Sequence, residues 1–173
     1  GGSDNIGGLV GYNEGTITNA HATGSVSGRY GVGGFAGYND GSISNAYATG
    51  SVSGTGNNVG GFVGHDGYDG SSISNAYATG DVLGEDNVGG FVGGNYGSIN
   101  DAYATGSVSG TGNNVGGFVG SNDGSITNAY ATGSVSGDSD VGGFVGSNDD
   151  GTITNAYATG SVSGNDCIGG FAG

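Results

Sequence analysis

A segment of 26 to 29 residues is repeated along the whole chain, and this repeat constrains the fold more than any other feature. The consensus copy reads Val-Gly-Gly-Phe-Val-Gly, a short loop, Gly-Ser-Ile-Ser-Asn-Ala-Tyr-Ala-Thr-Gly-Ser-Val-Ser-Gly, and a second short loop. A fixed period of this length is typical of solenoids, propellers and repeat arrays. We expect residues 1–173 to form one repeat domain without visible caps, whose coils begin near Ile6, Val32, Val59, Val88, Val115, Val141 and Ile168.

The composition of the repeat predicts β-strands rather than helices. The helix-favouring residues Lys, Gln and Met are absent from the chain. In the last segment of each copy, small apolar residues such as Ala48 and Val52 alternate with hydroxyl residues such as Thr49 and Ser51. This period of two predicts a strand with the apolar set inward and the hydroxyl set outward.

Three short strands are expected in each coil, at Gly-Gly-Phe-Val-Gly, around Ser-Ile-Ser-Asn-Ala, and at Ala-Thr-Gly-Ser-Val-Ser-Gly. The predicted fold is therefore all-β, a narrow, three-faced parallel β-solenoid of about six coils with 26–29 residues per coil. Strands of successive coils would stack about 4.8 Å apart. The usual crossover rule, applied by analogy, predicts a right-handed coil.

Two columns of residues are candidates for the interior. One Phe per coil, with Leu9 in the first, is expected to point inward, although strict alternation from Val32 would place Phe35 outward. An exposed column would form an apolar stripe that needs a partner. A column of Asn is predicted to form an internal amide ladder at a turn, with Asp101 replacing it once: Asn19, Asn45, Asn75, Asn128 and Asn155.

The chain is strongly acidic, with a formal net charge of −14 and Arg29 as its single Lys or Arg. Binding of nucleic acid needs clustered basic side chains, so this class of partner is excluded. Membrane insertion is not expected, because the sequence has no transmembrane run, signal peptide or lipidation motif. Cys167 is the single cysteine and cannot form an intrachain disulfide.

The segment Gly8-Leu9-Val10-Gly11 resembles the motif that names the GLUG repeat. The following Asn-x-Gly-x-Ile-x-Asn-Ala-Tyr-Ala-Thr-Gly-x-Val is also similar to that family, and the resemblance covers essentially the whole chain. Six of the seven copies depart from the family by carrying Phe for Leu. The resemblance implies a repeat region of a large secreted or surface protein of bacteria, in a stalk or adhesive role, and it implies no catalytic residue.

Residues that break the repeat are the candidates for catalysis, because an active site must differ from its copies. His21 stands in a Tyr column, Asp81 and Leu83 stand in Ser columns, and these breaks fall in different coils. His65 and Asp66 begin the longest loop, followed by Tyr68 and Asp69, and we expect them to be solvated surface residues. No acid–base pair is assembled, so we expect no enzyme.

The loops are rich in Asp and Asn, whose oxygens suit Ca²⁺. The spacing changes from copy to copy, and turn chemistry alone also favours these residues. No cofactor is therefore required, with Ca²⁺ as an open alternative. The candidate metal ligands are Asp138, Asp140, Asp149 and Asp150.

The outward residues Tyr-x-Thr-x-Ser-x-Ser repeat in register and form a candidate ligand face. Such a lattice of hydroxyls could dock a polysaccharide or order water as an ice-binding face does, or simply be a solvated β surface. Its candidate residues are Tyr47, Tyr77, Tyr103, Tyr130 and Tyr157, with Thr23, Thr49, Thr79, Thr105, Thr132 and Thr159.

These observations predict a structural protein without catalysis. We expect an extracellular or cell-surface rod of bacterial origin that acts as a stalk, an adhesive segment or a filament-forming element. Its partners would be further copies of itself stacked end to end, because open strand edges are templates for another chain, or other surface and matrix components. The alternative is a ligand-binding solenoid that uses the hydroxyl face for polysaccharide or ice.

Overall fold

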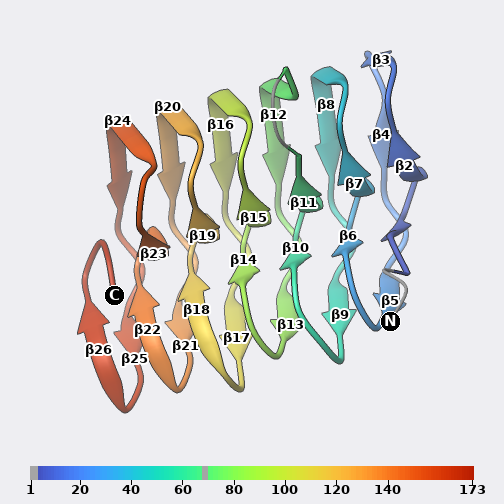
Figure 1. The fold of residues 1–173 in the computed structure, drawn as a ribbon. Helices are drawn as coiled ribbons and strands as arrows, with labels where there is room; N and C mark the ends of the chain where they lie inside the picture. Colours follow the sequence, from blue (N-terminus) through green and yellow to red (C-terminus); the bar gives the residue numbers. More distant parts are fainter. Residues whose placement is uncertain (1–3, 68–69) are drawn as a thin grey trace.

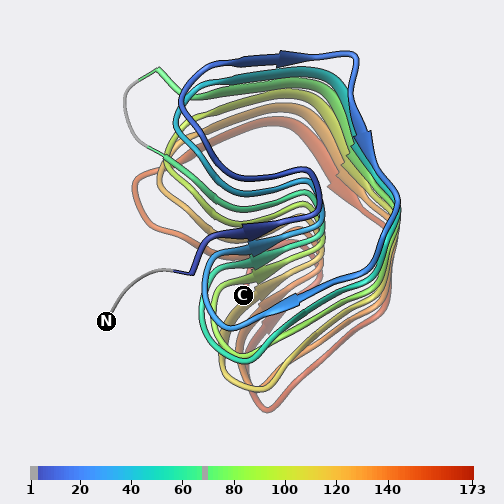
Figure 2. The ribbon, with the colours of Figure 1, turned by 90° about the vertical axis from the view of Figure 1, so that its right-hand side faces the viewer.

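The computed structural model describes residues 4–67 and 70–173 and contains four parallel β-sheets that run along a rod. Each coil passes once through all four sheets, and its strands pair with the same strands of the coils before and after it (Figure 1). Seen from the N-terminal end, the chain turns clockwise as it recedes, so the solenoid is right-handed (Figure 2). The predicted all-β parallel solenoid is confirmed.

The prediction of three strands per coil and of three faces is wrong, because the structure has four sheets. The segment Gly-Gly-Phe forms a corner that divides the first expected strand in two. Before the corner, a strand of the first sheet ends at Gly33, and after it the next strand begins at Ala36 in the second sheet. The cross-section therefore has two lobes joined at a narrow waist (Figure 2).

The first and second sheets meet at the waist, and each forms the waist-side wall of one lobe. The first sheet contains β1 (Ile6–Gly7), β6 (Val32–Gly33), β10 (Val59–Gly60), β14 (Val88–Gly89), β18 (Asn113–Gly116), β22 (Ser139–Gly142) and β26 (Asp166–Gly169). The second contains β2 (Val10–Asn13), β7 (Ala36–Asn39), β11 (Val63–Asp66), β15 (Val92–Asn95), β19 (Val119–Asn122) and β23 (Val145–Asn148).

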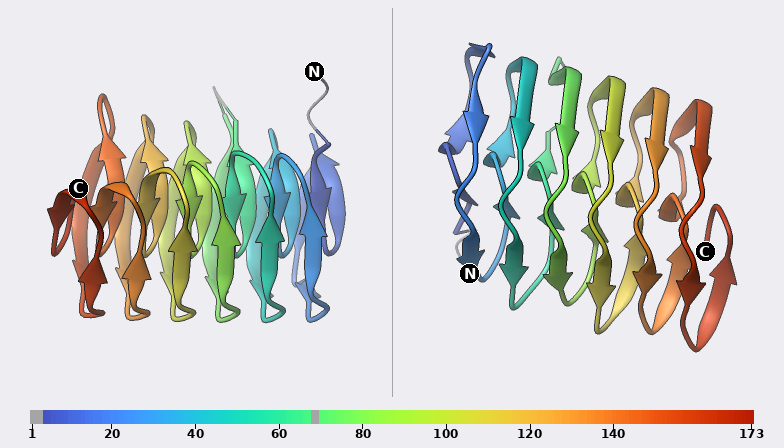
Figure 3. Two further views of the ribbon diagram at one scale, coloured as in Figure 1. Left: turned by 90° about the horizontal axis from the view of Figure 1, so that it is seen from below. Right: turned by 180° about the vertical axis from the view of Figure 1, so that it is seen from behind.

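The third and fourth sheets form the outer wall, and each strand of the third continues into the fourth (Figure 3). The third sheet contains β3 (Thr16–Thr18) with β4 (His21–Ala22), β8 (Ser42–Ala48), β12 (Ser72–Ala78), β16 (Ser98–Ala104), β20 (Ser125–Ala131) and β24 (Thr152–Ala158). The fourth contains β5 (Val26–Gly28), β9 (Val52–Gly54), β13 (Val82–Gly84), β17 (Val108–Gly110), β21 (Val135–Ser136) and β25 (Val162–Ser163).

Each lobe has its own apolar core. The lobe between the second and third sheets is filled by the Phe column together with Ile and Ala, as in Phe62, Ile73 and Ala76. The lobe between the first and fourth sheets is filled by facing Val columns, as in Val52 and Val59. Val and Phe therefore both point inward, each into a different lobe, which removes the conflict in the alternation pattern. The inward Phe column is confirmed, and its rings stack 4.8 to 5.0 Å apart along the rod.

The Asn column of the third sheet lies on the surface, so its predicted internal position is wrong. Asn45 and the residues equivalent to it have positive φ values of 48 to 54°. This conformation resets the alternation within the strand, so that Ile43 and Ala46 are both buried while Asn45 is exposed. The turn chemistry of the prediction is correct, because Asn tolerates the left-handed region better than most residues. The members of the column are Asn19, Asn45, Asn75, Asp101, Asn128 and Asn155.

Candidate functional site

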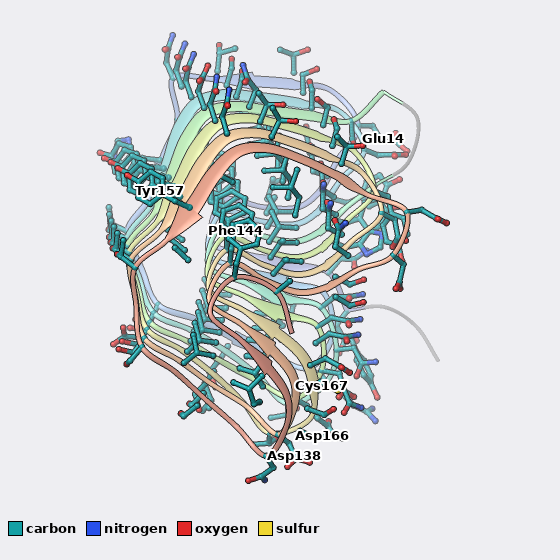
Figure 4. The ribbon with its side chains drawn as sticks, turned by 90° about the vertical axis from the view of Figure 1, so that its left-hand side faces the viewer. Glu14, Asp138, Phe144, Tyr157, Asp166 and Cys167 are labelled. Atoms are coloured by element: carbon teal, nitrogen blue, oxygen red, sulfur yellow. The ribbon has the colours of Figure 1, made fainter. Side chains whose placement is uncertain are left out.

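The Tyr column of the outer face forms one continuous stack. The rings of Tyr77 and Tyr103 lie 4.9 Å apart with an interplanar angle of 4°, and the other members of the column repeat this geometry. Figure 4 shows the stack, which ends at Tyr157, projecting outward on the side of the strand opposite Phe144. Burial, and then the neighbours Tyr130 and Tyr77, raise the pKa of Tyr103. The stack runs through His21, Tyr47, Tyr77, Tyr103, Tyr130 and Tyr157.

This stacking determines what the Tyr column can bind. Inside the column each ring face is covered by the rings before and after it, so a ligand can reach only ring edges and hydroxyl groups. A sugar ring therefore cannot lie flat on an internal Tyr. Tyr157, at the end of the stack, is 53% exposed.

The predicted Thr column lies beside the Tyr column and is exposed along its whole length. Each Thr follows the end of a strand of the third sheet. From Thr49 onward its backbone N–H donates to an Ala carbonyl of the preceding coil, as from Thr105 to Ala78 at 3.1 Å. The side chains are thus presented in register at the spacing of the coils. The column contains Thr23, Thr49, Thr79, Thr105, Thr132 and Thr159.

A shallow groove with a volume of ≈ 570 Å³ runs along the fourth sheet, between the two Ser columns and over the Val column. Neighbouring hydroxyls hydrogen-bond along the rod, from Ser136 to Ser109 at 3.2 Å and from Ser161 to Ser134 at 3.1 Å. Asp81 lies in the groove, and its Oδ1 accepts the backbone N–H of Ser107 at 2.9 Å. The groove extends from Ser25 to Ser163, so its lining repeats in every coil.

The four predicted metal ligands are divided between two different loop columns. Asp138 and Asp140 lie between β21 and the middle of β22, whereas Asp149 and Asp150 follow β23. These loops are at opposite ends of the cross-section. Figure 4 labels Asp138 in one loop column, and in the other it labels Glu14, which follows β2 as Asp149 follows β23. Within residues 4–67 and 70–173, no group of three or more His, Cys, Asp or Glu side chains is arranged to hold a metal ion.

Cys167 lies beside Asp140 and Asp166. Its thiol is exposed and free, its φ is 49°, and the nearby Asp166 raises its pKa. The same left-handed position is occupied in other coils by Asn58, Asn87 and Asn114. Cys167 therefore replaces an Asn that tolerates this backbone conformation more easily.

The sequence prediction missed a second ladder of side-chain amides, which is buried from Asn13 to Asn122 and exposed at Asn148. Asn13 donates from Nδ2 to Oδ1 of Asn39 at 2.7 Å, and Asn95 donates in the same way to Asn122 at 2.7 Å. One residue per coil belongs to this column, four residues after the Phe or Leu position. That fixed spacing is visible in the sequence and could have separated these residues from the variable loop. The ladder residues are Asn13, Asn39, Asp66, Asn95, Asn122 and Asn148.

The prediction that His65 and Asp66 are solvated loop residues is wrong, because both belong to strand β11. His65 is stacked between the rings of Tyr38 and Tyr96, 4.8 and 5.1 Å away, and its burial lowers its pKa. Asp66 is buried on the other side of the strand. The two side chains therefore do not form an acid–base pair. Tyr68 and Asp69 lie outside the described residues.

The residues that break the repeat fill ordinary column positions. His21 stacks on Tyr47 at 4.9 Å. Asp101 Oδ1 accepts a hydrogen bond from Asn128 at 3.0 Å in the exposed Asn column. Leu83 lies with Asp81 in the groove. The Tyr column, the Asn column and the groove are different parts of the surface, so these residues do not converge on one site.

The GLUG motif model matches six consecutive segments of the chain, at residues 2–27, 28–53, 55–83, 84–109, 111–136 and 137–163. The chain belongs to the GLUG family. Each GLUG segment is one complete coil, which begins and ends near the turn from the fourth sheet back to the first. No curated protein and no solved structure matches the chain.

The GLUG coil thus consists of a fixed set of columns with variable loops between them. Its outer face offers hydroxyl groups and the edges of stacked aromatic rings, and its interior contains Phe, Ile, Val, Ala and buried amides. The described part of the chain contains no helix that is long and apolar enough to cross a membrane.

Proposed function

We propose that this GLUG-repeat protein is an extracellular structural rod without catalytic activity, which acts as a stalk or adhesive spacer at a bacterial surface. The observation that carries the proposal is the unbroken register of all four sheets. The coil that begins at Val59 is 29 residues long, yet Val63 still pairs with Val92 and Ile73 with Ile99. Insertions are therefore accommodated in loops and do not interrupt the rod.

The positions of the residues that break the repeat support the proposal that the rod has no catalytic activity. His21, Asp81 and Asp101 each take part in a ring stack or hydrogen bond that belongs to their own column. A hydrolase or lyase would need several such residues to converge on one substrate.

The spacer function can be tested by adding coils. A second copy of residues 55–136 would add three coils and lengthen the rod by about 14 Å. We expect small-angle scattering to show this increase in maximum dimension, with the protein still monomeric. A control chain with a Gly-Ser insertion of equal length should not gain a rod-like dimension. An unchanged length would contradict the spacer function.

Electron microscopy separates the stalk from the filament. Single short rods support the stalk, and long fibres would instead identify a filament whose copies stack end to end. The same images recorded with a calcium chelator test the role of the loop carboxylates, because fibres that fall apart would require Ca²⁺.

The groove favours a second candidate function, the binding of a neutral polysaccharide. Its lining carries Ser hydroxyl groups and the exposed apolar side chain of Leu83, with Asp81 as the one charged side chain among its lining residues. The net charge of −14 disfavours an acidic polymer. Ser134→Tyr would fill the groove and should abolish binding to an array of neutral glycans, whereas Ser125→Tyr, exposed on the third sheet outside the groove, should not.

The ice-binding alternative predicts thermal hysteresis. Thr105→Tyr would interrupt the Thr column and should abolish the hysteresis without unfolding the rod. A protein without hysteresis is not an ice-binding protein.

A further inference from the structure

The buried amide ladder requires one hydrogen-bond donor at each step. In the four steps that have a hydrogen bond, the side chain of one coil donates to Oδ1 of the next coil, and every donor–acceptor distance is 2.7 Å. An Asn satisfies both requirements, because its Oδ1 accepts and its Nδ2 donates. Asn is found at five of the six positions, and Asp66 occupies the remaining one, in the third coil.

Asp66 fits the accepting half of this pattern. Its Oδ1 accepts from Nδ2 of Asn39 at 2.7 Å, as an Asn at this position would. Its Oδ2 therefore takes the place of the donating Nδ2. Asp66 pairs in register with Asn95, whose Oδ1 is the next acceptor in the ladder.

Two buried oxygen atoms remain unpaired at this step. Among the described residues, Asp66 Oδ2 and Asn95 Oδ1 are the buried side-chain atoms without a hydrogen-bond partner. Both side chains are fully shielded from solvent. An ionised carboxylate has no proton to donate, so this step would place two acceptors against one another, which is costly in a buried site.

We propose that Asp66 and Asn95 form a proton-binding site, in which Asp66 is a neutral carboxylic acid that donates from Oδ2 to Oδ1 of Asn95. The bound proton completes the ladder from Asn13 to Asn148. Its loss leaves a buried charge and a break in the ladder at the third coil. The proposal concerns the stability of the rod and does not depend on the proposed function.

The surroundings of Asp66 favour the neutral acid. Burial raises the pKa of Asp66 to about 7, and the nearby Asp40 adds to this effect, while the side chains of Asn39 and Ser71 oppose it. Ser71 lies close by, but its single hydroxyl proton is donated to the Gly67 carbonyl oxygen at 2.7 Å, so it does not neutralise the carboxylate.

The other elements packed against β11 contribute no compensating charge. Strand β15 contributes Asn95 in the same ladder, and β7 contributes Asn39, followed by Asp40. His65 neighbours Asp66 in sequence but lies on the opposite side of the strand, where burial lowers its pKa. No positively charged group therefore faces Asp66 among the described residues of these strands.

A metal ion fits this step less well than a proton. A Ca²⁺ ion takes six to eight oxygen ligands at about 2.3 to 2.6 Å, and an ion between two oxygens would hold them far apart. The neighbouring steps of the ladder have atoms 2.7 Å apart, which suits a shared proton.

The proposal predicts how stability depends on pH. The unfolded chain releases the Asp66 proton near pH 3.8, and the folded chain releases it near pH 7. The stabilisation is therefore complete below about pH 4 and is lost as pH rises through 7. From these two values, the contribution of Asp66 to the folding equilibrium constant should fall by about a thousandfold across this range.

The test compares thermal unfolding of the full chain and of Asp66→Asn from pH 4 to 9. The variant restores the residue found in the other five coils, so we expect it to fold. The wild type should lose stability relative to the variant as pH rises, and the variant should be the more stable of the two above pH 7. Both proteins retain His65, so its opposite pH dependence cancels in the comparison. A constant difference at every pH would overturn the proposal.

Asp101→Asn is the matched control, because it makes the same change in the exposed Asn column and should follow the wild type at every pH. Carboxyl ¹³C resonances provide a second readout. The resonance that disappears in Asp66→Asn should titrate near pH 7, and a midpoint near 4 would overturn the proposal. Stabilisation of the wild type but not of Asp66→Asn by Ca²⁺ at pH 8 would also overturn it, in favour of a cation site.

Discussion

The side-chain amide of Asn95 donates to Oδ1 of Asn122 over 2.7 Å, although 27 residues separate them in the sequence. Asn122 in turn donates to Oδ1 of Asn148 at 2.7 Å and to the carbonyl of Gly124 at 3.4 Å. One amide thus connects its own coil to both neighbours. These bonds lie at the end of the second sheet, where the chain leaves the core for a variable loop.

Asn122→Ala should destabilise the rod by about 2 kcal/mol, because it leaves the buried Nδ2 donor of Asn95 without a partner. The thermal unfolding midpoint measures the loss. Asn57→Ala, an exposed position outside the ladder, is the control and should change stability little. Equal effects of the two substitutions would show that the buried ladder contributes nothing beyond a surface Asn.

Phe118→Ala should cost about 4 kcal/mol, because it removes a fully buried ring and opens a cavity in the Phe column. Phe118→Leu should cost much less, since Leu9 occupies the same column in the first coil. Chemical denaturation followed by circular dichroism measures both.

Phe171→Ala is the control for this series. Phe171 also stacks in the column, 5.0 Å from Phe144, but it is 37% exposed. Its loss should therefore cost less than the loss of Phe118, and the opposite order would contradict the assignment of the column as the main support of its lobe.

The period of the repeat was sufficient to predict the solenoid. Equivalent residues of successive coils can form continuous sheets only if the coils stack in register. The inward positions of Ala48 and Val52 also followed from simple alternation, and both are buried. Alternation failed where the backbone changes direction. Asn45 has a φ of 51°, which shifts the pattern by one residue and brings Asn45 to the surface.

The burial of Asp66 was harder to predict, because an Asp followed by Gly in a long insertion has the composition of a solvated turn. The decisive evidence is its alignment with Asn39 and Asn95 in the neighbouring coils, which the loop length conceals. The side-chain contacts of the Tyr column also depend on ring orientation, which spacing in the sequence does not specify. The groove between the Ser columns likewise follows from the shape of the fourth sheet.

Gly90→Ala should be destabilising by about 3 kcal/mol, because the corner at the waist has no space for a side chain. A Cβ at Gly90 would overlap the carbonyl oxygen of Gly117 in the next coil and lie 3.2 Å from Cβ of Ala104. The thermal midpoint is the measurement. Gly24→Ala is the control, since nothing lies within 4 Å of its Cβ position, and it should be tolerated. A tolerated Gly90→Ala would mean that the waist can widen.

Asn75→Ala should cost about 1 kcal/mol, because Ala is strained at the φ of 48° that this position adopts. Asn75→Gly should be better tolerated than Asn75→Ala, since Gly reaches this region without a steric penalty. Ser74→Ala, in the same strand and outside the left-handed region, controls for the loss of a polar side chain. Greater stability of Asn75→Ala than of Asn75→Gly would contradict the backbone explanation.

The pH dependence attributed to Asp66 should move with the carboxyl group. In the double variant Asp66→Asn, Asn95→Asp, the acid lies one coil further along, where its second oxygen faces Oδ1 of Asn122. Residue 95 is fully buried, so desolvation should again raise the pKa of the new carboxyl, and stability should again be lost as pH rises from about 4 to 7. Thermal unfolding across this range measures the slope, with Asp66→Asn alone as the reference without it. A double variant with no pH slope would show that Asp40 and the other neighbours of Asp66, rather than the ladder itself, hold the proton in the third coil.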